Sequence, residues 1–367
     1  MTNNHKDNHR TSPNKFYQFI KNFTPNWFAV TMGTGITAIC LNTLHLPHIH
    51  TFSTFLWGMN IVIFTAMLLI FIIKHIGTPN AFHEMLKHSI QPMFLSCIPM
   101  GLATIINGCI FFGIDIFGGE VASIAFYLWI VDIILAILCI IVVPYYMFNY
   151  HEHTINNMTG VWLLPFVACE VASTTGALII PFMKHTTQVN MFILCIVLWT
   201  LSVSLALMIL VILFQRLALH KVPPVELSGT IWLPLGPTGT AAMSMFLFSK
   251  ISSCIDLSLI PNAQFMNFIK TMSSVGIFLG VIFWSMATWW FVLAVFITIK
   301  YIKTGMMKFN LGFWGYTFPL GVYTMSSVLF GQISNISIIQ TYGIILVISL
   351  FLIWVYVFRR TLGILNI

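Results

Sequence analysis

Apolar stretches long enough to cross a lipid bilayer recur ten times along the chain. A membrane-spanning helix needs about 20 predominantly apolar residues. The bilayer interior offers no water to unpaired backbone groups, so such stretches fold as helices that satisfy their own N–H and C=O groups. The pattern predicts spans over 26–44, 55–73, 93–113, 121–143, 160–182, 189–214, 229–248, 273–299, 310–332 and 337–358.

The composition excludes a water-soluble globular domain. Charged residues make up 7% of the 367 residues and hydrophobic residues 58%, whereas a typical soluble domain is about 25% charged. We therefore expect an all-α integral membrane protein with ten transmembrane helices. The expected organisation is a cytosolic tail over 1–24, a single transmembrane domain over 25–360 and a cytosolic tail over 361–367.

The distribution of Lys and Arg predicts the orientation. If the N-terminus lies inside, thirteen of these residues fall in inside segments and three, Lys184, Lys250 and Lys270, fall in outside loops. An excess of Lys and Arg marks the cytoplasmic side. The sequence thus predicts a multi-pass protein of the cell membrane with both termini in the cytoplasm. The same rule accounts for the net charge of +7, so no nucleic-acid partner is expected.

Two kinds of span alternate along the chain. The odd spans contain 20 Gly and Pro in 106 residues, while the even spans contain 4 in 117 and no proline. Proline removes a backbone donor and disrupts the interior of a helix. The alternation predicts five helical hairpins, each with one kinked and one smooth helix.

The kinked spans share a local pattern of proline, an apolar residue and glycine. It is present at Pro99, Pro234 and Pro319, whereas Pro165 has no following glycine. Freed backbone groups are tolerated at membrane depth only where they are buried in protein or line a wet cavity. We expect the odd helices to line a central pore, although Gly, Ser and Thr also serve close helix packing. The predicted pore-lining residues are Gly33, Thr34, Gly35, Pro99, Gly101, Pro165, Glu170, Pro234, Gly236, Pro237, Thr317, Pro319 and Gly321.

Anions are the favoured cargo of such a pore, because helix N-termini present N–H groups and a positive dipole end. None of the ten predicted spans contains Lys or Arg. Selectivity would then come from helix ends and hydroxyl groups rather than from a fixed cation.

The segments "NFTPNWFAVTMGTGI" and "WGYTFPLGVYT" of the first and ninth spans resemble the tellurite-resistance/dicarboxylate transporter family. The resemblance implies ten helices around a central pore, commonly in a homotrimer, and no enzymatic activity or cofactor. It implies transport of a small anion, such as a C4-dicarboxylate like malate, sulfite, tellurite or an inorganic anion. It also implies a phenylalanine plug, which is placed at Phe318, with Phe166 as the alternative gate; an apolar ring can close a pore by excluding water.

Two carboxylates lie within predicted spans. An ionisable residue inside the membrane is by default a candidate functional site, so we expect Glu170 to be a proton-coupling or pH-sensing residue. Asp132 in a smooth span is expected to have a structural partner. A passive gated channel and a proton-coupled carrier both remain open.

The histidines raise the alternative of an integral membrane metalloenzyme. His45, His48 and His50 fall in one predicted outer loop, and His151, Glu152 and His153 in one inner loop. The segment "HEMLKH" misses the zinc-binding H-E-x-x-H spacing by one residue. The expectation is therefore that no metal is bound. The seven cysteines form no C-x-x-C pair, which favours buried thiols over a disulfide or metal framework.

Overall fold

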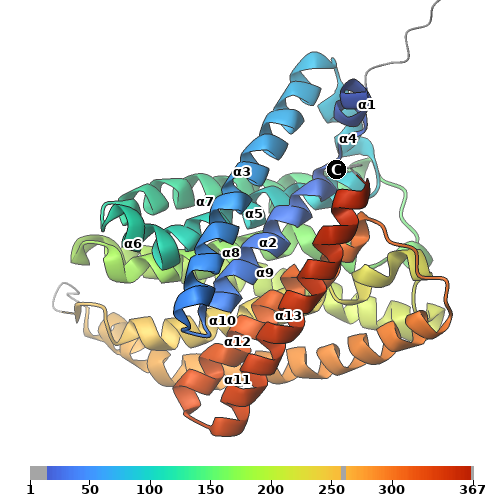
Figure 1. The fold of residues 1–367 in the computed structure, drawn as a ribbon. Coiled ribbons are helices and arrows are strands. Elements are labelled where there is room, and N and C mark those ends of the chain that lie inside the picture. Colours follow the sequence, from blue (N-terminus) through green and yellow to red (C-terminus); the bar gives the residue numbers. More distant parts are fainter. Residues whose placement is uncertain (1–14, 258–261, 365–367) are drawn as a thin grey trace, which may run out of the picture.

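The computed structural model describes residues 15–257 and 262–364, which form helices and connections without a β-strand (Figure 1). Residues 1–14 and 365–367 of the two predicted tails lie outside the described residues. The helices at the two ends are α1 (Lys15–Asn22), which falls within the predicted N-terminal tail, and α13, which extends to Ile364. Helix α13 spans Ser337–Ile364. The α-helices between these two are α2 Ala29–Asn42, α3 Pro47–Gly77, α4 Ala81–Lys87, α5 Cys97–Gly108, α6 Ile114–Phe117, α7 Val121–Asn149, α8 Leu164–Ile179, α9 His185–His220, α10 Leu235–Ser252, α11 Ala263–Lys303 and α12 Phe318–Ser334.

Eight helical stretches of the described chain are long and apolar enough to cross a membrane. They correspond to every predicted span except the first and the ninth, and an all-α membrane protein is confirmed. At the two remaining positions the α-helices α2 and α12 have 14 and 17 residues. At 1.5 Å per residue, α2 extends only about 21 Å. The count of ten transmembrane helices therefore stays a prediction.

Each odd span begins with a tight 3₁₀ segment that leads into its α-helix. These segments are η1 Pro25–Phe28, η2 Gln91–Ser96, η5 Gly160–Leu163, η7 Val225–Ile231 and η9 Leu311–Tyr316.

The repeated prolines follow these 3₁₀ segments. Pro99, Pro165 and Pro319 lie within the first three residues of α5, α8 and α12, and Pro234 directly precedes α10. A residue there has no α-helical partner for its N–H, so the missing donor of proline costs little. The structure thus differs from the expected mid-helix break: the prolines mark where the α-helices start.

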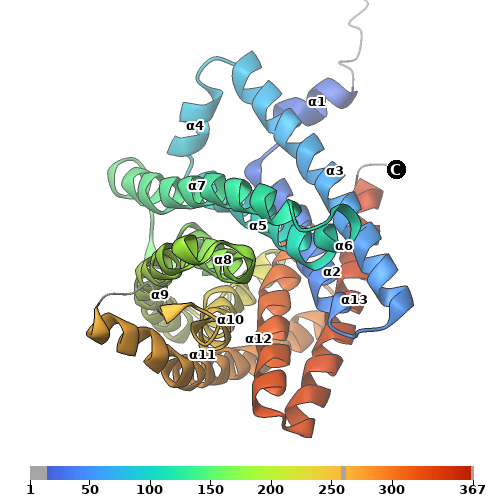
Figure 2. The same cartoon turned by 90° about the vertical axis from the view of Figure 1, so that its left-hand side faces the viewer.

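The α-helices of the odd spans form a closed ring, here called the ring, in which α2, α5, α8, α10 and α12 contact one another in that order and α12 returns to α2. The 3₁₀ segments contact one another in the same cyclic order. In Figure 2 these five helices surround the middle of the molecule. Helices α3, α7, α9, α11 and α13 each pack against the ring helix adjacent in sequence.

Burial separates the ring from the outer helices. In the ring spans 91–117, 160–182 and 225–252, between 72 and 100% of the most apolar segment is buried, compared with 28 to 39% in the outer helices. The outer helices expose apolar side chains such as Phe55, Val62 and Leu69, as lipid contact requires. They are also longer than predicted, and α7 includes Pro144 beyond the predicted end at residue 143.

Candidate anion pathway in the ring

A cavity of about 70 Å³ lies where the five ring helices begin. Every ring helix contributes to it, through Met32 of α2, Met100 of α5, Val167 of α8, Gly236 of α10 and Phe318 of α12. Residues of the 3₁₀ segments complete the wall at the end of the bundle where the helices start. We call this space the ring cavity.

The electrostatics of the ring cavity come from the backbone. None of the described residues that line it is charged. Five α-helices begin there with the positive ends of their dipoles toward the cavity. Their first N–H groups are hydrogen-bonded to residues that precede each helix, for example Leu164 N to Val161 O and Leu235 N to Trp232 O. The cavity is therefore an apolar chamber with a positive potential, which favours a small anion over a cation.

Three of the predicted site residues line the ring cavity: Gly236, Phe318 and Pro319. Phe318 is the first residue of α12 and is 5% exposed. Its aromatic side chain therefore lies against the cavity with little access from solvent. Phe166 does not line the cavity, and its carbonyl accepts a hydrogen bond of 2.6 Å from Ser202 Oγ of α9. Of the two predicted gates, Phe318 lines the ring cavity and Phe166 does not.

The predicted glycines fall into two groups. A Cβ at Gly33, Gly35, Gly101 or Gly321 would collide with a side chain of a neighbouring helix. These four glycines lie at helix–helix contacts, where they permit close approach of the backbones. A Cβ at Gly236 would meet no atom within 4 Å, because this glycine faces the ring cavity.

Hydroxyl groups of the ring are mostly committed to their own helices. Thr317 Oγ1 donates to Trp314 O at 2.8 Å, and Thr238 Oγ1 donates to Pro234 O at 2.8 Å. Thr34 Oγ1 accepts from Trp354 Nε1 of α13 at 3.1 Å. Pro237 lines a different small cavity toward α9 and α11. Because these hydroxyl groups are already hydrogen-bonded within the protein, they stabilise the helix packing. The helix dipoles then remain as the source of positive potential along the pathway.

The two buried carboxylates lie away from the ring cavity. Glu170 of α8 faces α9, where its Oε2 is 3.4 Å from Ser202 Oγ, and its Oε1 has no hydrogen-bond partner within the described structure. Asp132 of α7 is fully buried, and neither carboxylate oxygen has a partner among the described residues. The structural role expected for Asp132 therefore stays a prediction, without a hydrogen bond to support it in that part of the chain.

Met32 and Met100 are among the cavity-lining residues that the sequence pattern did not predict. Each directly precedes a glycine that was predicted to line the pore. Successive residues are about 100° apart around a helix, so when Gly33 and Gly101 face neighbouring helices the methionines can face the cavity. The signal was present in the repeated Met-Gly pair, but the side of the helix could not be assigned without the packing.

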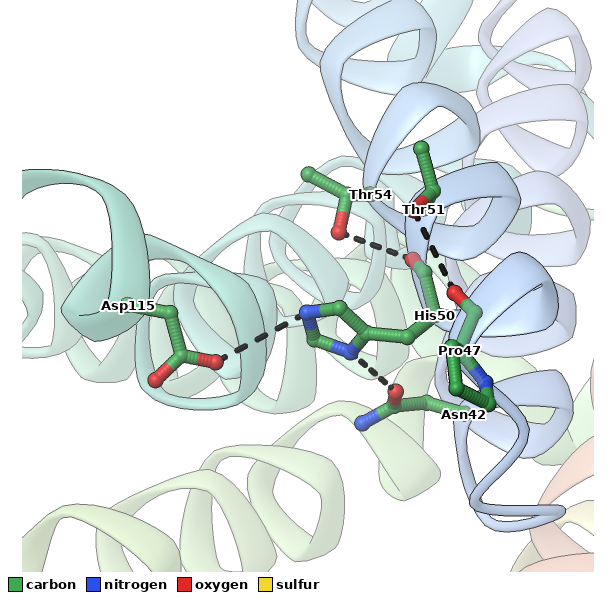
Figure 3. Close-up of polar contacts among 6 residues, drawn as sticks. All are labelled: Asn42, Pro47, His50, Thr51, Thr54 and Asp115. Carbon is green, nitrogen blue, oxygen red and sulfur yellow. Dashed lines mark hydrogen bonds and ion pairs between the residues drawn. The ribbon is translucent and has the colours of Figure 1, made fainter.

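The histidines of the proposed metal sites have other contacts. His50 lies in the first turn of α3 rather than in a loop. It links α3 to the end of α2 and to α6, since its Nδ1 is 2.8 Å from Asn42 Oδ1 and its Nε2 is 3.7 Å from Asp115 Oδ2 (Figure 3). His83 Nδ1 is 3.2 Å from Tyr146 OH. Across the described ranges, no three His, Cys, Asp or Glu side chains come together as a metal site would require.

His151 and His153 lie in the connection between α7 and η5. His151 Nε2 is 2.7 Å from Leu86 O, and the rings of His153 and Trp162 are 4.8 Å apart. Partial burial, and then the neighbouring His151, lower the pKa of His153 below its ordinary value. The pair thus braces the connection against α4 and η5.

The sequence is similar to those of known proteins over almost its whole length. The family model described as voltage-dependent anion channel matches residues 22–362. A sulfite efflux pump of Arthroderma otae is 36% identical over 349 residues, which cover 93% of this chain and 90% of the pump. An uncharacterized transporter of Methanocaldococcus jannaschii is 26% identical, covering 94% of this chain and 95% of the archaeal protein.

A malic acid transport protein of Schizosaccharomyces pombe is 19% identical over 344 residues, covering 92% of this chain and 77% of that protein. The family resemblance seen in the first and ninth spans is thereby confirmed, as is the prediction that the protein is not an enzyme. The chain belongs to the voltage-dependent anion channel family and is a membrane anion-transport protein.

Proposed function

We propose that this protein conducts small oxyanions through the ring cavity, with sulfite favoured over malate, and that the Phe318 side chain closes the pathway. The observation that carries this proposal is the convergence of five helix N-termini on one uncharged cavity lined by Phe318. The proteins described as sulfite efflux pumps support sulfite as the cargo.

The size and lining of the ring cavity favour sulfite over a dicarboxylate. Its volume of about 70 Å³ is well below the 300–1,000 Å³ typical of pockets for drug-sized ligands. Two carboxylates of one ligand are usually bound through Arg or Lys, and no charged side chain lines the cavity in the described structure. A compact anion that is held by backbone dipoles fits this arrangement better than malate.

Flux into liposomes that contain the purified protein tests this proposal. Sulfite, malate, chloride and potassium are compared, with and without a pH gradient and an imposed voltage. We expect sulfite flux to exceed malate flux and potassium to be excluded. Potassium flux, or the absence of flux for every anion, would contradict the proposal.

A proton-coupled carrier is the second candidate, and the contact of Glu170 with Ser202 favours it. Ser202 Oγ donates to Phe166 O at 2.6 Å and also lies 3.4 Å from Glu170 Oε2, so this hydroxyl of α9 is the hydrogen-bonding neighbour of the Glu170 carboxyl of α8. A carboxyl that binds and releases a proton between two helices could couple proton movement to helix movement. Uphill sulfite accumulation driven by a pH gradient alone would distinguish this carrier from a channel.

The finer points of location and assembly are also proposals. The excess of Lys and Arg at one side supports a cell-membrane protein with both termini in the cytoplasm. The first and ninth helices are proposed to cross the membrane together with their 3₁₀ segments. A homotrimer with one pathway in each subunit is supported by the family resemblance, and the mass of the detergent-solubilised complex tests it.

A further inference from the structure

A groove outside the ring lies between the C-terminal parts of α11 and α13. It has a volume of about 610 Å³ and is lined by residues that include Ile302 of α11, Phe313 of η9, and Leu352 and Tyr356 of α13. This volume falls in the range of about 300–1,000 Å³ of pockets that hold small molecules. Ile302, Leu352 and Tyr356 are 61, 62 and 53% exposed, so the groove opens to the surroundings of the bundle.

Trp232, Phe313, Tyr316 and Tyr356 form an aromatic wall of the groove, and Phe309 continues the series next to Phe313 and Tyr356 without lining the groove itself. Trp232 and Tyr316 have ring centroids 5.3 Å apart, Tyr316 and Phe313 5.5 Å, and Phe313 and Phe309 5.1 Å. The Phe309 ring also lies 6.4 Å from Tyr356. Such a rigid apolar wall in the membrane suits the contact surface of an acyl chain.

Three cations lie next to residues of this wall or of the groove lining. The Arg360 guanidinium carbon lies 5.7 Å from the centroid of the Phe309 ring. Lys303 and Lys308 are exposed neighbours of the lining residues Ile302 and Met307. Within residues 15–257 and 262–364, none of these three cations is paired with a carboxylate. The groove therefore combines an apolar interior with nearby cations that carry no carboxylate partner in the described structure.

We propose that this groove binds an anionic phospholipid, with an acyl chain against the aromatic wall and the phosphate against Lys308 and Arg360. Basic pockets between transmembrane helices bind anionic headgroups through the attraction of Lys and Arg for phosphate. The charge of these cations and the apolar character of the wall together select this occupant over a neutral lipid. The site is independent of the ring cavity and of the transported anion.

Native mass spectrometry of the full-length protein in detergent tests the site. The protein is titrated with phosphatidylglycerol or with phosphatidylcholine that has the same acyl chains. We expect phosphatidylglycerol to bind more tightly. The double variant Lys308→Gln/Arg360→Gln should weaken that binding by at least about tenfold, since each lost cation is worth about 1 kcal/mol. Binding of phosphatidylcholine by this variant should be unchanged.

Two further variants complete the test. Lys184→Gln/Lys270→Gln removes the same charge outside the groove and should bind phosphatidylglycerol like the wild type. Leu352→Trp fills the exposed apolar part and should weaken binding of both lipids. Equal binding of the two lipids by the wild type, or wild-type binding by Lys308→Gln/Arg360→Gln, would overturn the proposal. A Leu352→Trp variant that changes the oligomeric mass and leaves lipid binding unchanged would also overturn it, since a second copy of the chain would then cover the groove.

Discussion

Gly33 of α2 packs directly against Thr317, the residue that precedes Phe318 at the start of α12. A Cβ at residue 33 would collide with Thr317 Oγ1 and with the Trp314 ring. The hydroxyl has a fixed position, because it donates to Trp314 O at 2.8 Å. The placement of the proposed gate therefore depends on the absence of a side chain at residue 33.

The variant Gly33→Ala should destabilise the protein and change anion flux. Overpacking a close contact typically costs about 1–3 kcal/mol, and the strain would fall on the start of α12. Gly236→Ala is the matched control, because a Cβ there meets no atom within 4 Å and alanine favours a helix by up to about 1 kcal/mol. The Gly236→Ala protein should unfold at a temperature no lower than the wild type, while its ring cavity is narrower. A Gly33→Ala protein that melts like the wild type would contradict this packing argument.

The variant Phe318→Ala should raise the anion conductance. Removing the aromatic ring opens the apolar constriction at the start of α12 to water and ions. Phe166→Ala is the control, because Phe166 does not line the ring cavity and its carbonyl contact with Ser202 does not need the side chain. Conductance is measured in planar bilayers for both variants. If Phe166→Ala increases it and a folded Phe318→Ala does not, the gate is at residue 166.

The recurrence of glycine and proline was sufficient to predict which spans form the interior. Sequence shows that Pro99, Pro165, Pro234 and Pro319 recur in alternate spans, and lipid exposure restricts where such residues are tolerated. The sequence did not show that each proline lies at the start of an α-helix after a 3₁₀ segment. The position at which the α-helix begins depends on contacts among the five 3₁₀ segments around the ring.

It was harder to predict whether a residue faces a neighbouring helix or the ring cavity. Gly33 and Gly236 look equivalent in sequence, yet one packs against α12 and the other faces the ring cavity. A glycine gives no sign of its orientation, because it has no side chain whose polarity could differ between lipid, protein and cavity. Glu170 was similarly expected in the pore, whereas its carboxylate lies between α8 and α9 next to Ser202.

The orientation can be tested with Cys254, which is exposed while the other six cysteines are buried. It follows α10 in a loop that the distribution of Lys and Arg places outside. A membrane-impermeant maleimide should label the wild type in intact cells and leave Cys254→Ser unlabelled. Lys308→Cys in the Cys254→Ser background should react only after permeabilisation. The reverse pattern would place the termini outside.

Replacement of Glu170 by glutamine distinguishes the carrier from the channel. Glutamine has nearly the same shape and cannot exchange a proton at this site, so it preserves packing between α8 and α9 and removes titration. If Glu170 couples protons, Glu170→Gln should abolish sulfite accumulation driven by a pH gradient and retain flux down a sulfite gradient. Both fluxes are measured in the same liposomes, with Asp132→Asn as the comparison because Asp132 is equally buried but lies on α7. Accumulation that survives in Glu170→Gln at the wild-type rate would exclude Glu170 as the coupling residue, since the glutamine amide cannot bind and release a proton.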